Sequence, residues 1–202
     1  MDTDNPKKMS NLNTSATAVA VAVVIVLTAA TFARNKVFRD NISLWTDVVA
    51  KSPNKGRGYN DLGNAYARAD MLEKAGAAYL KSVSLDPTNS DAHNDLGIYY
   101  YKTNQYDLAV QAYETAMELK PNQADPHNNL GIIYGERGEM DKAIAEFSKA
   151  IKLKAGAGNG SYYKNRGTAY AKSNEAGKAR ADFEQACALG DRDACGLLNT
   201  AP

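Results

Sequence analysis

The segment SDAHNDLGIYYYKTNQYDLAVQAYETAMELKP, residues 90–121, decides the fold. Its only glycine is Gly97, and aromatic, small and proline residues follow it at fixed intervals: Tyr100, Ala109, Tyr113, Ala116 and Pro121. Gly97 and Tyr100 are three residues apart. Ala109, Tyr113 and Ala116 stand at i, i+4 and i+7, and both spacings place residues on one helix face. Residues 103–105 separate the two faces, and the proline ends the second helix. The segment therefore predicts a pair of packed helices.

The same pattern recurs along the chain at nearly constant spacing. Its glycines are 34, 34 and 36 residues apart: Gly63, Gly97, Gly131 and Gly167. In every unit a tyrosine follows the glycine by three residues, an alanine by twelve and an aromatic residue by sixteen. One helix pair cannot bury its own apolar face, so the units must stack. The sequence therefore predicts an all-α array of four helix pairs over residues 56–193.

These spacings and residue types resemble the tetratricopeptide repeat (TPR) family, whose unit is a helix–turn–helix of 34 residues. The resemblance implies a right-handed superhelical solenoid in which the first helix of every unit lines a concave groove. The fourth unit departs from the pattern, because Arg166 replaces the leucine that precedes the other three glycines. Residues 194–202 would form a C-terminal cap.

Half a repeat precedes the first full unit. Counting back 34 residues from Tyr79 reaches Trp45, so we expect residues 34–55 to hold a junction and a solitary second helix. The stretch ARNKVFRDNISLWTDVVAKSPN, residues 33–54, also resembles the junction in polytopic glycosyltransferase-C type proteins, where the last membrane helix runs into an extracytoplasmic TPR array. Only one apolar segment is present here, so glycosyl transfer is not implied.

That apolar segment lies near the start of the chain. Residues 16–33 read ATAVAVAVVIVLTAATFA, and 18 helical residues span roughly 27 Å, close to the thickness of a hydrocarbon core. We expect a transmembrane helix there, after a polar tail of residues 1–15. A cleaved secretory signal is the alternative, because Lys7 and Lys8 precede the segment and Ala33 stands at a plausible cleavage site.

The side of the membrane follows from two opposing observations. Positive charges after the apolar segment outnumber those before it by three to two, which favours cytoplasmic repeats. Cys187 and Cys195 resemble the cysteines of secreted TPR relatives, which implies a disulfide and an oxidising compartment. A small buried apolar residue is the alternative role for Cys187. With the junction, the cysteines favour an inner (plasma) membrane protein whose repeats are periplasmic.

Composition and motifs argue against several classes of function. The chain has 24 Lys and Arg against 23 Asp and Glu, and this balance argues against nucleic acid as a ligand. The two histidines, His93 and His127, stand four residues before a repeat glycine, where they serve packing, and no third histidine or cysteine joins them to make a metal site. We expect no enzymatic activity, no metal and no cofactor.

The candidate binding residues are side chains that first-helix positions direct into the groove. They are Asn60, Asn64, Arg68, Asn94, Ile98, Tyr101, Lys102, Asn128, Ile132 and Lys164. Asn60, Asn94 and Asn128 would form a ladder of amides one repeat apart, able to bond the backbone of an extended peptide. A merely solvated face is the alternative.

The expected function is that of a membrane-anchored scaffold or adaptor that binds a protein or peptide partner in its groove. The alternative is an accessory or assembly subunit of a larger membrane protein complex, in which residues 16–33 would contact other membrane helices.

Overall fold

A computed structural model describes residues 19–24, 26–27, 41–154, 156 and 158–198, and no strand occurs among them. The helices from residue 56 onward are α2 (Gly56–Arg68), α3 (Leu72–Leu85), α4 (Ser90–Lys102), α5 (Tyr106–Leu119), α6 (Ala124–Glu136), α7 (Met140–Leu153), α8 (Gly160–Lys172), α9 (Ala176–Ala188) and α10 (Arg192–Leu198). The even-numbered helices up to α8 are the first helices of the four units, and the odd-numbered ones are the second helices.

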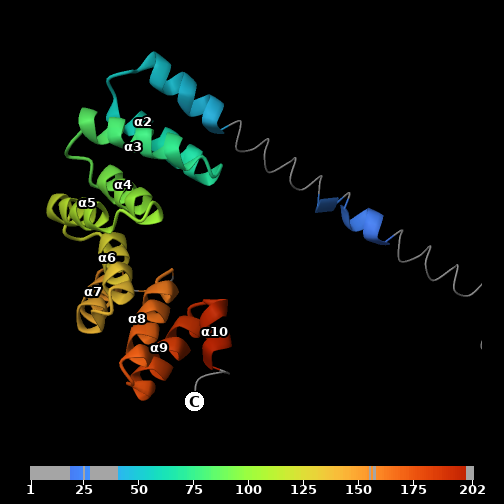
Figure 1. The fold of residues 1–202 in the computed structure, drawn as a ribbon, viewed down its shortest axis with the longest axis vertical. Coiled ribbons are helices and arrows are strands. Elements are labelled where there is room, and N and C mark those ends of the chain that lie inside the picture. The colour runs from blue at the N-terminus through green and yellow to red at the C-terminus, as the bar shows by residue number, and fades with distance from the viewer. Residues whose placement is uncertain (1–18, 25, 28–40, 155, 157, 199–202) are drawn as a thin grey trace, which may run out of the picture.

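The helix pairs stack into a curved array that begins at α2 and ends at α10 (Figure 1). Each helix from α2 to α10 packs on the next, and each first helix also contacts the first helix of the following unit. The first helices therefore lie side by side along one face of the array. The predicted all-α solenoid of four helix pairs is confirmed.

A glycine and an aromatic ring hold the two helices of every unit together. A Cβ atom built on any of the four repeat glycines would lie only 2.4–2.8 Å from a ring carbon of the second helix. The four rings are 1–4% exposed, so they cannot move outward without leaving the core. The pairs are Gly63 with Tyr79, Gly97 with Tyr113, Gly131 with Phe147, and Gly167 with Phe183. Only a residue without a side chain permits this approach.

The turn within each unit is also repeated at the same position. Seven residues after each repeat glycine the backbone is left-handed, with φ between 59° and 78°, at Asp70, Asn104, Gly138 and Asn174. Glycine, asparagine and aspartate are the residues that tolerate this conformation best. The next amide then donates back to the carbonyl five residues earlier, as from Met71 to Tyr66 at 2.9 Å. Every helix pair therefore turns in the same way.

The arginine that departs from the repeat pattern has its own partner in the fourth unit. The Arg166 guanidinium donates two hydrogen bonds of 2.8 Å to the buried carboxylate of Asp182 on α9. A third bond, of 3.0 Å, goes to the Ser148 hydroxyl on α7. Paired charges satisfy each other when they leave water, so this contact takes the place of the leucine packing of the other units.

Residues 41–51 form a helix that packs against α2 as a half repeat. Methyl carbons of Val48 and Val49 lie 3.3–3.4 Å from the position that a Cβ of Gly58 would occupy. This helix covers the face of α2 that would otherwise begin the array.

The structure corrects the expected membrane location. No helix in the described part of the chain is both long and apolar enough to cross a membrane. Within the expected span, residues 16–18, 25 and 28–33 lie outside the described residues. The prediction of a single-pass inner-membrane protein with periplasmic repeats is therefore wrong. The expected polar tail, residues 1–15, lies outside the described residues.

The end of the array is closed by α10, which begins at Arg192, two residues before the expected cap. Cys187 on α9 and Cys195 on α10 form a disulfide, with Cα atoms 4.8 Å apart. Residues 199–202 of the expected cap lie outside the described residues.

If this disulfide forms in the cell, alkylation of freshly lysed cells will leave both cysteines unmodified unless a reductant is added first. Mass spectrometry of the peptides that contain Cys187 and Cys195 measures this directly. Full alkylation without reductant would contradict the pairing.

Replacing Gly97 by alanine should destabilise the array, because the new Cβ would lie 2.4 Å from the Tyr113 ring. Overpacking a core of this kind costs about 1–3 kcal/mol. Gly177, on the exposed surface of α9, has no atom from beyond its own helical turn within 4 Å of its Cβ position, and Gly177→Ala in this first turn should change stability by less than about 1 kcal/mol. Urea unfolding of both variants tests the contrast, and equal stability would refute the packing role of Gly97.

Candidate functional site

All ten predicted binding residues lie on first helices of the four units. Their helices are as follows: Asn60, Asn64 and Arg68 on α2, Asn94, Ile98, Tyr101 and Lys102 on α4, Asn128 and Ile132 on α6, and Lys164 on α8. Neighbouring first helices contact one another, and a shared groove lined by these side chains stays a prediction.

The three asparagines of the predicted ladder each bond to the next unit along the groove. In all three cases the partner stands two residues before the glycine of that next unit. The bonds are 2.9–3.1 Å long and join Asn60 to Asp95, Asn129 to Asn94, and Asn165 to Asn128. Asn60 and Asn128 are only 6% and 8% exposed. These amides link neighbouring units, and their binding of a peptide backbone stays a prediction.

Two further predicted residues, Lys164 and Tyr101, interact with acidic side chains. The Lys164 ammonium lies 3.0 Å from Asp193 and 3.4 Å from Asp191, so it ties α8 to the C-terminal cap. The Tyr101 hydroxyl donates to the Glu136 carboxylate of the next unit.

Three further cations lie at the last turns of first helices. Arg68, Lys102 and Lys172 end α2, α4 and α8, and none of them makes an ion pair with another residue in the described part of the chain. Glu136 holds the same position on α6, and the charge of Arg68 acts on the Asp61 carboxylate.

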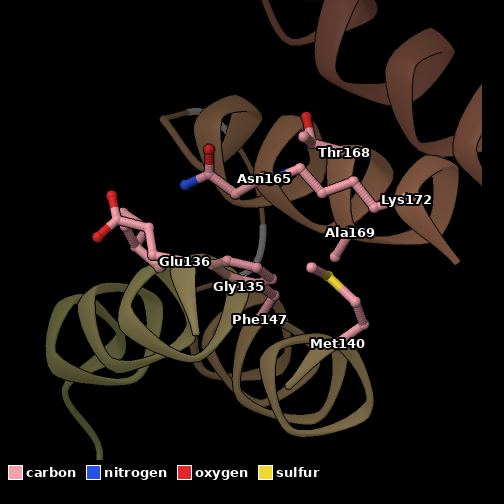
Figure 2. Close-up of a pocket in the computed structure, with 9 residues that line it drawn as sticks. Gly135, Glu136, Met140, Phe147, Asn165, Thr168, Ala169 and Lys172 are labelled. Carbon is pink, nitrogen blue, oxygen red and sulfur yellow. The ribbon is translucent and has the colours of Figure 1, made fainter. Parts of the chain in front are cut away.

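A cavity of about 200 Å³ opens into the groove between the third and fourth units. We call it the apolar cavity, and it is lined by Ile132, Gly135, Glu136, Met140, Phe147, Asn165, Thr168, Ala169 and Lys172. Figure 2 shows Met140 of α7 directed toward Ala169 of α8 across it, while the Glu136 carboxylate points away. The apolar residues come from two units, and the polar ones stand at the rim. Such a site can accept an apolar side chain with polar groups around it.

A second cavity, of about 400 Å³, lies between the first and second units. We call it the polar cavity, and it is lined by Arg57, Asn60, Asp61, Asn64, Asn89, Asp91 and Asp95. It holds three carboxylates and one guanidinium, so its net charge is negative when all of them are ionised.

Asp95 is the central acceptor of the polar cavity. The side-chain amides of Asn60 and Asn64 both donate to the same oxygen of its carboxylate, at 3.0 Å each. The Tyr79 hydroxyl donates to Asn64 at 2.8 Å and fixes that amide in turn. Burial raises the pKa of Asp95 above its ordinary value of 3.8, even though hydrogen bonds from Asn64, Asn60 and Asn94 act in the opposite direction.

The two histidines have different hydrogen-bond partners. A ring nitrogen of His93 is 2.9 Å from the carbonyl of Pro87, at the turn before α4. Nδ1 of His127 is 2.7 Å from the Glu146 carboxylate on α7. Among the described residues, no group of three or more His, Cys, Asp or Glu side chains could hold a metal ion.

Sequence reasoning missed Asp61, Asp95 and Asn165, which line the two cavities. All three stand two residues before a repeat glycine, and this position is polar in every unit. That periodicity is a signal that could have found them. Met140 could not be found in this way, because it reaches the groove from the first residue of a second helix.

Comparison with family models identifies the repeat. One model described as TPR repeat matches residues 99–136, and two described as tetratricopeptide repeat match residues 78–111 and residues 56–89 and 124–156. Together these segments run without a gap from residue 56 to 156. The predicted family of the repeats is confirmed there. The matches do not reach residues 33–54, so the resemblance of that stretch to glycosyltransferase-C type proteins is not supported.

Solved structures share the fold. Two crystal structures titled MamA are 28% and 27% identical to this chain, with TM-scores of 0.64 and 0.63. They cover 78% and 79% of this chain and 91% and 86% of their own. TTC0263, a thermophilic TPR protein of Thermus thermophilus, is 18% identical, covers 81% of this chain and 90% of its own, and has a TM-score of 0.68. No curated protein matches the chain.

The buried carboxylate of Asp95 should make stability depend on pH. The pKa of Asp95 is higher in the folded chain than in the unfolded chain, where it is about 3.8. Above pH 3.8 the folded chain therefore holds this proton more tightly than the unfolded chain does. As the pH rises from 3.8 through the raised pKa, the contribution of Asp95 to stability falls. Asp95→Asn keeps a carbonyl oxygen for Asn60 and Asn64 without the buried charge. We expect the variant to melt a few degrees above the parent at pH 7 and at the same temperature below about pH 3.8. A less stable variant at pH 7 would contradict this account.

Proposed function

Because residues 56–156 consist of tetratricopeptide repeats, we propose that this chain is a scaffold that holds an extended segment of a partner protein in its concave groove. TPR proteins generally mediate protein–protein interaction or scaffolding, and the fold is typically non-enzymatic. The alternative role, a subunit of a larger assembly, stays a prediction.

The apolar cavity is the observation that carries the proposal. It is open to the groove and spans two units, so one side chain of a bound segment would contact α6, α7 and α8 at once. Gly135 and Ala169 leave room there that larger residues would fill, while the walls of Ile132, Met140 and Phe147 are apolar. An apolar side chain of the partner gains free energy by leaving water for such a site.

The edge of the groove adds electrostatic complementarity. Arg68, Lys102 and Lys172 stand at the same position of three first helices, five residues after the repeat glycine, and Glu136 holds that position in the remaining unit. Carboxylates of a bound segment would be attracted to this edge, an effect that governs the rate and the register of binding more than its strength.

The proposal is tested by filling the apolar cavity. A Cβ on Gly135 would lie 3.9 Å from the nearest atom, in ordinary contact, so Gly135→Leu should fold and place its side chain in the space intended for the ligand. Peptides selected on the parent protein from a random phage-display library supply the ligand. Their dissociation constants, measured by fluorescence anisotropy, should rise at least about tenfold, which is 1.4 kcal/mol.

Gly177→Leu is the matched control, because it makes the same change on the exposed surface of α9, where the Cβ meets no atom within 4 Å. It should bind the selected peptides as the parent does. If Gly135→Leu also binds them with unchanged affinity, the apolar cavity is not the anchor, and the proposed function fails.

A further inference from the structure

We propose that the disulfide between Cys187 and Cys195 is a redox switch at the end of the array. When it is reduced to two thiols, α10 separates from α9, and the Lys164 ammonium on α8 is released from the cap. The use of that ammonium by a bound segment rests on the proposed function, whereas the release of α10 does not.

The disulfide stands where the earlier units use an apolar contact. Twenty residues after the repeat glycine, the position of Cys187 holds an apolar residue in each of the first three units. Each of these packs on a buried cluster that includes a residue of the next first helix: Val83 with Leu96, Met117 with Leu130, and Ile151 with Tyr162. The four clusters of the described residues lie within residues 66–169, so none of them joins α9 to α10.

Little else holds α10 in place. It is seven residues long, and Ala194 is its one buried residue, whereas α2, α4, α6 and α8 each bury at least four. A helix of this length is not stable in water without tertiary contacts. The ion pair between Lys164 and Asp193 adds little, because the Asp193 side chain is 82% exposed. The docked position of α10 therefore depends on the disulfide.

A reductant in solution can reach this disulfide, because both Cys187 and Cys195 are only half-buried. A thiolate of a protein dithiol attacks one Sγ atom, the S–S bond breaks, and the other cysteine leaves and takes up a proton. The second thiol of the reductant then attacks the mixed disulfide and releases the first cysteine. Two electrons and two protons pass from the dithiol to the protein, and the dithiol becomes a disulfide.

While the disulfide is intact, the cap occupies the Lys164 ammonium. This ammonium lies 3.0 Å from Asp193 and 3.4 Å from Asp191. The Asp191 carboxylate also accepts a bond of 3.1 Å from the Ala194 amide, so it is coupled to α10. Lys164 stands three residues before Gly167, at the position of the ladder asparagines in the earlier units. Once both carboxylates leave, the ammonium can pair with a carboxylate of a bound segment.

Hydrogen exchange of the full chain tests the release of α10. The protein is compared before and after reduction with dithiothreitol. Reduction should speed the exchange of the α10 amides at least about tenfold and leave the α4 amides as they were. The variant with both Cys187→Ser and Cys195→Ser is the control, and it should exchange like the reduced parent whether or not dithiothreitol is present.

Lysine labelling tests the release of the ammonium. Only the neutral amine reacts with an acetylating ester, and neighbouring carboxylates keep the amine protonated. Acetylation of Lys164, followed by mass spectrometry, should therefore become at least about threefold faster on reduction. Lys172 lies on the same helix and has no ion pair with a described residue, so its rate should stay constant.

Equal exchange of α10 in the two redox states would overturn the switch, and so would an equal loss of protection in α4. An unchanged rate at Lys164 would overturn the release of its ammonium. Neither measurement uses a peptide, so the proposed function is decided separately. If α10 opens on reduction but the selected peptides ignore Gly135→Leu, the switch stands and the proposed function fails.

The selected peptides that contain Asp or Glu test the use of the ammonium. Their Kd should fall at least about threefold when the parent is reduced, because Lys164 then offers a free charge. Lys164→Gln lacks that charge, so its Kd should not respond to reduction. An equal response of the parent and this variant would contradict the role of Lys164.

Discussion

The contact between a glycine and an aromatic ring is the constraint on which the whole solenoid depends. Each repeat glycine lets a buried tyrosine or phenylalanine approach its helix backbone, closer than any side chain would allow. That approach sets the distance between the two helices of a unit, and the left-handed residue seven positions later sets the turn between them. Since both features recur in all four units, each unit presents nearly the same surface to the next.

This regularity turns equivalent positions into lines of side chains along the inner face. The asparagine three residues before each of the first three repeat glycines bonds to the polar residue two positions before the next repeat glycine. These side chains therefore also hold neighbouring units together. The two ends of the groove differ because these lines change composition. Carboxylates gather around the polar cavity between α2 and α4, whereas isoleucine, methionine and phenylalanine surround the apolar cavity between α6 and α8.

The spacing of glycines and aromatics was sufficient to predict the helix pairs, because each repeat position has one structural role. It did not predict the cavities, since each combines side chains from different units: Met140 and Ala169 meet only once α7 and α8 are packed. The three asparagines of the amide ladder bond to neighbouring units, and these bonds could not be read from single positions. The membrane prediction relied on the hydropathy of residues 16–33, and no helix in the described part of the chain is both long and apolar enough to cross a membrane.

The central claim is that a partner segment lies in the groove and is anchored by the apolar cavity. A crystal structure of the chain with one of the selected peptides tests it most directly. The account predicts an extended peptide along α2, α4, α6 and α8 with an apolar side chain between Gly135 and Ala169. A peptide bound on the second helices, with the apolar cavity empty, would contradict it.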